Sequence, residues 1–169
     1  LNFDLDITSS KVMDILKSFG LEVHEGIGKT GIVAVLKNGN SNKSIGIRAD
    51  MDALPVTEEN DCTYKSNHEG KMHACGHDGH TAMALGAAKY LCNTKNFNGT
   101  VYFIFQPDEE KTQGAQAMID DGLFEKFPMD EVYAFHNLPG MELGTFATRA
   151  GTITASESLF KIELRGQGG

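Results

Sequence analysis

The most constraining feature of the sequence is the run TVYFIFQ at residues 100–106, which is almost continuously apolar and β-prone. Such a run is expected of a central strand that is covered on both faces. Shorter runs of the same kind, at 31–37, 44–50 and 131–136, alternate with segments of helical periodicity at 8–19, 81–91 and 115–121. This alternation predicts an α/β fold with several parallel strands, whose carboxyl ends gather the functional groups.

Turn-forming and polar residues separate these segments. Residues 38–43, NGNSNK, predict a hairpin-type turn between the strands on either side. Residues 50–70 are polar and aperiodic and predict a loop. The helix at 81–91 comes next, with Asp78 or Thr81 as its N-terminal cap, so we expect the preceding Cys/His cluster to lie on a loop.

The stretch MHACGHDGH at residues 72–80 contains one cysteine and three histidines, side chains that transition metals prefer. Taken alone, a cysteine is commonly a small buried residue and a histidine commonly a helix cap. These roles do not explain why ligand-type side chains lie so close together here, so Cys75 and His77 are the candidate metal ligands. A closed structural zinc site would need paired ligands, usually with CxxC spacing, and the other two cysteines provide none. We therefore expect an open, catalytic type of site, with His73 and His80 supporting the ligands or the fold.

Acidic residues and a histidine follow the predicted strands. Glu109 and Glu110 come after the central run on backbone that we expect to be extended, where neighbouring side chains point to opposite sides. One carboxylate could bind a metal while the other acts as a general base, although a solvated acidic turn is the common alternative. Asp50 and Asp52 are an i, i+2 pair, one of which could orient a metal-bound histidine. His136 alone would be a satisfied histidine, but a catalytic metal usually needs at least three protein ligands.

The composition restricts the partners and the location. With 15 basic and 23 acidic residues the formal charge is -8, and no basic cluster interleaved with aromatic residues offsets it, so nucleic acid is not expected as a partner. No apolar run approaches the roughly 20 residues that span a bilayer, so we expect no membrane partner. The 3 widely spaced cysteines suit a reducing compartment, and the predicted location is the cytoplasm.

Five segments, in order along the chain, resemble one protein family. They are RADMDALPVTEE, KMHACGHDGHTA, FQPDEE, AFHNLPG and ELRGQGG. Together they are similar to the metal-dependent amidohydrolases that include hippurate hydrolases, N-acyl-amino-acid amidohydrolases and indole-acetyl-amino-acid hydrolases, relatives of zinc carboxypeptidases and aminoacylases. The resemblance implies a three-layer α/β fold, with a mixed, largely parallel sheet flanked by helices as in zinc-peptidase catalytic domains.

The resemblance also implies roles for the site residues. Two divalent ions, of zinc, manganese, cobalt or nickel, would be bound by four side chains: Cys75, His77, Glu110 and His136. Glu109 would be the catalytic base, and Asp52 the acid that supports the metal site. Asp50 stands where more distant relatives carry a metal-binding histidine. The family usually has a small residue before its glutamate pair, whereas this chain has Asp108.

By the same resemblance we expect two domains. Residues 1–154 would be a catalytic domain that is incomplete at both ends, and residues 155–169 the first strand of an inserted α+β lid and dimerisation domain. Similar enzymes are much longer and carry a last metal-binding histidine near the C-terminus. We therefore expect a homodimer formed through the lid in the full-length protein, and weak or no activity from residues 1–169 alone.

The predicted activity is hydrolysis of the amide bond of N-acyl-amino acids or short peptides, with Glu109 as general base on water activated by the metal. Related alternatives are a dipeptidase or carboxypeptidase and an N-acetyl-diaminopimelate deacetylase. A non-catalytic metal-binding domain is a further alternative, although such a domain would not need Glu109. A thiol redox role for Cys75 is disfavoured, because the sequence has no CxxC motif near it.

Overall fold

The computed structural model describes residues 1–169 except 157, 159 and 169. The helices are α1 (Asp6–Ser18), α2 (His77–Thr94), α3 (Gly114–Asp120) and α4 (Leu123–Lys126). The strands are β1 (Glu22–Ile27), β2 (Gly31–Asn38), β3 (Ser44–Asp50), β4 (Gly99–Gln106) and β5 (Glu131–Ala134). Within this described part of the chain, no helix has the length and apolar character needed to cross a membrane.

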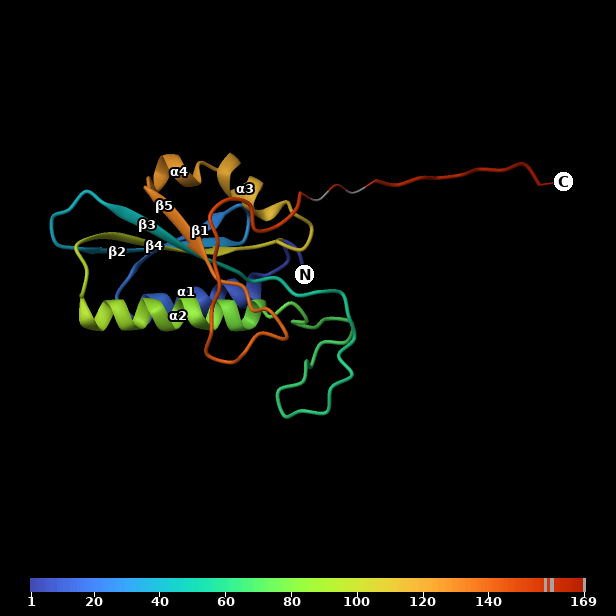
Figure 1. Ribbon diagram of the computed structural model, residues 1–169, viewed down its shortest axis with the longest axis horizontal. Coiled ribbons are helices and arrows are strands. Elements are labelled where there is room, and N and C mark those ends of the chain that lie inside the picture. Colours follow the sequence, from blue (N-terminus) through green and yellow to red (C-terminus); the bar gives the residue numbers. More distant parts are fainter. Residues whose placement is uncertain (157, 159, 169) are drawn as a thin grey trace. The chain divides into compact units, whose positions relative to one another are not determined.

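The strands form one five-stranded mixed sheet in the order β1-β2-β4-β3-β5 (Figure 1). β1 pairs with β2, and β2 with β4, in antiparallel fashion, whereas β3 runs parallel to both β4 and β5. Helices α1 and α2 cover one face of the sheet, and α3 and α4 lie on the other (Figure 1). The predicted fold class, a mixed sheet flanked by helices in three layers, is confirmed.

The central strand β4 is covered on both faces, as its sequence predicts. Phe103 and Phe105 are fully buried in the core between the sheet and helices α1 and α2, which also contains Leu16. Ile104, on the opposite face, packs in a second core with Met118 of α3. Successive side chains of a strand point to opposite faces, so an unbroken apolar run is stable only with a layer on each side.

The expected hairpin between residues 31–37 and 44–50 is wrong, because β4 lies between β2 and β3 and pairs with both. This order puts the most apolar strand at the centre of the sheet, where both of its faces are buried. β2 forms its hairpin with β1 instead, through a turn in which Gly28 and Lys29 have φ angles of 64° and 75°. The sequence does not predict β1, because its residues, EVHEGI, are largely polar and form a half-exposed strand.

The strand expected at 131–136 is shorter and less buried than predicted. β5 ends at Ala134 and forms an edge of the sheet, and the side chain of Tyr133 is 51% exposed. β3, β4 and β5 run parallel to one another, so the segments that follow Asp50, Gln106 and Ala134 all leave the sheet at the carboxyl ends of these strands. The candidate site lies at this end of the sheet.

The chain divides into two compact units, Leu1–Asn137 and Leu138–Gly169. The first unit contains the sheet and the helices named above. In the second unit, the residues that the structure describes form turns and irregular segments. The lid strand predicted at 155–169 includes residues 157, 159 and 169, which lie outside the described residues, and it stays a prediction.

Candidate metal centre

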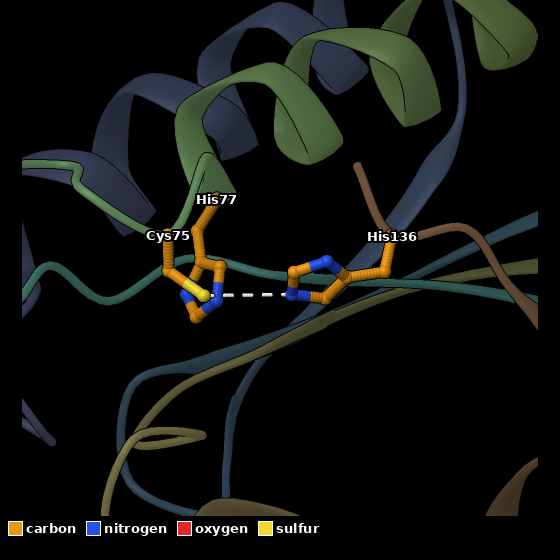
Figure 2. Close-up of side chains that lie close together, drawn as sticks. All are labelled: Cys75, His77 and His136. Atoms are coloured by element: carbon orange, nitrogen blue, oxygen red, sulfur yellow. Dashed lines mark hydrogen bonds between the residues drawn. The ribbon is translucent and has the colours of Figure 1, made fainter. Parts of the chain in front are cut away.

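Two loop ends and the start of α2 bring three possible metal ligands together. Cys75 precedes α2, His77 is its first residue, and His136 follows the end of β5. One ligand atom of each of these three residues lies within 4.8 Å of the others. Figure 2 shows the three side chains facing one another from the N-terminus of α2 and the segment after β5.

The turn before α2 sets the direction of two of these side chains. The N-cap of α2 is Gly76, whose φ of 86° lies in the left-handed region that glycine tolerates. The helix has no side-chain cap, so the predicted caps Asp78 and Thr81 are wrong. Cys75 lies on a loop as predicted, but His77 belongs to the first turn of the helix, which starts earlier than expected.

Cys75 and His136 are in direct contact, with 3.5 Å between the Sγ and Nε2 atoms. The other ring nitrogen of His136, Nδ1, lies 2.6 Å from the carbonyl oxygen of Asn137. Because a carbonyl oxygen can only accept, Nδ1 carries the proton and donates it. In the neutral ring this leaves the lone pair on Nε2, the atom that faces Cys75, and this is the tautomer that binds a metal.

His77 is fully buried and is surrounded by carboxylates. Its Nδ1 atom lies 3.4 Å from Asp52, and its Nε2 atom lies 3.6 Å from Asp50 and 3.7 Å from both Glu109 and Glu110. Burial lowers the pKa of His77, but Asp52 and Asp50 raise it, and its net pKa is above the ordinary value.

Some buried polar atoms of this group lack a hydrogen-bond partner among the described residues. They include both ring nitrogens of His77 and the Oε1 atom of Glu110. A buried polar group left without a partner costs about 1–3 kcal/mol, so proteins usually satisfy such atoms with water, an ion or a ligand. Thiol, imidazole and carboxylate groups together bind zinc and neighbouring divalent metals. The residues therefore fit a divalent cation.

The thiol of Cys75 lies in a negatively charged environment. Burial, together with the carboxylates of Glu110, Glu109 and Asp50, raises the pKa of Cys75 to about 11. Burial also raises the pKa of Glu109, although the nearby His77 opposes this effect. A divalent cation would offset the excess negative charge and favour the thiolate form.

Asp52 holds the turn that carries both glutamates. Its Oδ1 atom accepts a hydrogen bond from the backbone N–H of Glu109 (3.0 Å), and its Oδ2 atom accepts one from Glu110 (3.1 Å). The prediction that the two glutamates lie on extended backbone and point to opposite sides is wrong. Asp108 has a left-handed φ of 47°, which reverses the chain and brings both carboxylates to the same histidine.

Asp50 and His80 form a second buried pair beside this centre. Nδ1 of His80 lies 2.7 Å from Oδ1 of Asp50, and Oδ2 of Asp50 accepts a hydrogen bond from Arg48 (2.7 Å). Asp50, His77 and His80 are also close enough together to hold an ion. Both oxygens of Asp50 already have partners, however, which favours a supporting role for His80. His73 is exposed.

Residues 46–167 match the sequence profile of peptidase family M20/M25/M40. The chain belongs to this family. The chain is also similar to the hippurate hydrolase of Campylobacter jejuni subsp. jejuni. The two are 54% identical over 169 residues, which are 100% of this chain and 44% of the relative. Thermostable carboxypeptidase 2 of Saccharolobus solfataricus is 43% identical over 166 residues, 96% of this chain and 42% of that protein.

A solved Bacillus subtilis structure, of a dinuclear metal-binding peptidase of the M20 family, is similar to this chain with a TM-score of 0.78 and 37% identity. The similarity covers 83% of this chain and 39% of that one. The chain thus spans less than half the length of the relatives it matches. Together with the convergent donor groups, the likeness supports a divalent metal centre.

Proposed function

We propose that this chain provides metal-binding and catalytic residues of an amidohydrolase that cleaves the amide bond of N-acyl-amino acids. The observation that carries the proposal is the buried ring of His77. Its nitrogens have no hydrogen-bond partner among the residues that the structure describes, and they lie beside both the Cys75 thiol and the glutamate pair. Hippurate is itself an N-acylated amino acid, so the similarity to a hippurate hydrolase supports this substrate class.

The proposed ligands are four side chains from the N-terminus of α2 and two strand ends: Cys75, His77, Glu110 and His136. We propose two ions in this centre, where the donor group that includes the Cys75 thiol and the donor group that includes the glutamate pair meet at His77. The dinuclear B. subtilis relative is consistent with that number. Zinc, manganese, cobalt and nickel all accept this donor set, and availability often decides which is bound.

Glu109 is the proposed general base. A divalent cation, when bound, polarises the substrate carbonyl and lowers the pKa of water. Glu109 accepts a proton from the attacking water and then gives it to the leaving amine. Burial raises the pKa of Glu109 towards the working pH, which suits this task. Asp52 fixes the position of Glu109 through its backbone N–H and lies beside His77.

Glu110 differs from its neighbour in the way expected of a ligand. Its side chain is 19% exposed, against 36% for Glu109, and its Oε1 atom is buried without a hydrogen-bond partner in the described part of the chain. The less accessible carboxylate is therefore assigned to the metal, and the more accessible one to water and substrate.

The wider organisation is also a proposal. Residues 1–154 would belong to the catalytic domain and residues 155–169 to a lid and dimerisation domain, so that the whole protein would be a homodimer. The cytoplasm is the proposed location, because Cys62, Cys75 and Cys92 are all free thiols. The net charge of -8 argues against a nucleic-acid partner.

A carboxypeptidase acting on short peptides is a second candidate, supported by the similarity to the S. solfataricus enzyme. It would use the same chemistry, since a peptide bond is an amide between an acyl group and an amino acid. Comparing rates on hippurate, on N-acetyl-amino acids such as N-acetyl-diaminopimelate, and on dipeptides distinguishes these substrates.

The experiment that tests the proposal is hydrolysis of hippurate by the whole protein that includes this chain, with metal content measured on the same samples. We expect Glu109→Gln to retain its metal and to lose about 10²- to 10⁴-fold in rate, the usual contribution of a general base. Glu59→Gln, an exposed glutamate, is the matched control and should leave the rate unchanged. Metal binding without turnover of any of these substrates by the wild type would instead support a non-catalytic metal-binding domain.

A further inference from the structure

We propose that His80 is a positioning residue, which holds His136 in the metal centre through Asn137. The inference rests on the proposed metal centre and adds a connection to it, since His80 is not itself a ligand. The observation behind it is that β5 last pairs with β3 at Ala134, opposite Arg48, so His136 lies beyond the end of the sheet.

His80 is held firmly from one side. Its ring is 3% exposed, and its Nδ1 atom lies 2.7 Å from Oδ1 of Asp50, which is fully buried at the end of β3. Asp50 is held by Arg48 through Oδ2 (2.7 Å), and Arg48 donates from Nε to Oε1 of Gln106 at the end of β4 (2.8 Å). The hydroxyl of Thr81 donates to the carbonyl of Asp50 (2.9 Å) and ties α2 to the same strand.

The other side of the His80 ring holds Asn137. The backbone N–H of Asn137 lies 3.0 Å from Nε2 of His80, and the Oδ1 atom of Asn137 lies 2.7 Å from the same nitrogen. In either protonation state of the ring, one of these groups is a matching partner: the N–H for a free Nε2, or Oδ1 for a protonated one. The contact joins residues that are 57 positions apart.

Asn137 in turn sets the orientation of His136. Its carbonyl oxygen accepts the hydrogen bond from Nδ1 of His136 at 2.6 Å, which leaves Nε2 facing Cys75. A carbonyl behind a metal-binding histidine fixes both the tautomer and the ring direction. Asn137 therefore contacts His80 through its N–H and side chain, and His136 through its carbonyl.

Gly76 makes room for this arrangement. A Cβ atom at position 76 would lie 2.4 Å from Oδ1 of Asn137, a distance at which the amide would have to move. The same turn that aims Cys75 and His77 thus also seats the residue that aims His136. The three ligands are coupled through the turn, His80 and Asn137, and the edge strand β5 does not have to fix His136 alone.

The test is the Zn²⁺ dissociation constant, measured on the whole protein by competition with a chelator. We expect His80→Ala to weaken binding about 10- to 100-fold, as is usual when the support of a metal-binding histidine is lost. Asn137→Ala removes only the Oδ1 contact and keeps the backbone N–H and carbonyl, so we expect a smaller loss. In His80→Ala the contact that Asn137 makes through Oδ1 is already lost, so the double variant should bind Zn²⁺ about as tightly as His80→Ala alone. His68→Gln, an exposed loop histidine, is the control and should bind like the wild type.

Two features keep the test independent of folding. Asn137 is exposed, so its replacement by alanine leaves the core intact. His80→Gln places an amide oxygen near the position of Nε2, where it can accept from the N–H of Asn137, and it should recover part of the affinity that His80→Ala loses. An unstable core would not be repaired in this selective way.

The outcomes separate this inference from the proposed function. Wild-type protein that does not bind Zn²⁺ would contradict the metal centre itself. Wild-type protein that binds Zn²⁺, with His80→Ala binding it equally well, would overturn only the positioning role. Fully additive losses in the double variant, or no recovery in His80→Gln, would overturn it as well.

Discussion

The Nε2 atom of His136 lies 3.5 Å from the Sγ atom of Cys75, although the two residues are 61 positions apart in the sequence. The contact exists because β5 runs parallel to β3, so the segment after β5 leaves the sheet at the same end as the segment that leads from β3 to α2. The topology of the sheet, and not a local sequence motif, therefore brings this pair of proposed ligands together.

The two adjacent glutamates should separate metal binding from catalysis. Glu110→Gln removes a proposed ligand, so we expect metal affinity to fall by more than about 100-fold, beyond the effect of losing a supporting residue. Glu109→Gln should bind metal nearly as tightly as the wild type. The two variants have the same chemistry at neighbouring positions, so each is the control for the other. Equal loss of metal in both would contradict the assignment of separate roles.

Removal of the Asp52 carboxylate should destabilise the metal-free protein. Its two oxygens accept the backbone N–H groups of Glu109 and Glu110, which would be left without these partners in Asp52→Ala. We expect the free energy of unfolding to fall by about 1–3 kcal/mol in urea denaturation. Asp61→Ala, at an exposed position of the 50–70 loop, should stay within about 0.5 kcal/mol of the wild type. A change no larger than that of the control would show that the turn does not depend on Asp52.

Metal binding should release the proton of Cys75. The pKa of this thiol is raised to about 11 in the metal-free protein, so the group is protonated at neutral pH, whereas a bound metal requires the thiolate. Metal affinity should therefore rise as the pH rises towards 11. The release of this one proton accounts for about a tenfold increase in affinity per pH unit. Calorimetry in buffers of different ionisation enthalpy measures the release. Cys75→Ser should release about one proton fewer than the wild type, and an unchanged value would exclude thiolate ligation.

The sequence was sufficient where one residue type or one periodic pattern decides the structure. The apolar run at 100–106 predicts β4, and the short spacing between Cys75 and His77 predicts that their side chains lie close together. Neither prediction depends on a distant part of the chain. The hairpin prediction failed because the position of β4 in the sheet is set by burial on two faces, which depends on helices elsewhere in the chain.

The details of the site needed the fold. The φ of Asp108 turns Glu109 and Glu110 towards one histidine, and no spacing rule reveals that conformation. The sequence does not distinguish Asn137 as a site residue, because an asparagine after a strand is common in turns. Its position next to His136 is the signal that the sequence offers, and its contact with His80 depends on the segment after β5 reaching the first turn of α2.

The most direct test of the metal centre is the absorption spectrum of the Co²⁺-loaded protein. A cysteine thiolate bound to Co²⁺ gives a charge-transfer band in the near ultraviolet. We predict that the wild type and Cys62→Ser show this band and that Cys75→Ser loses it. Absence of the band from the wild type, or its persistence in Cys75→Ser, would contradict the metal centre described above.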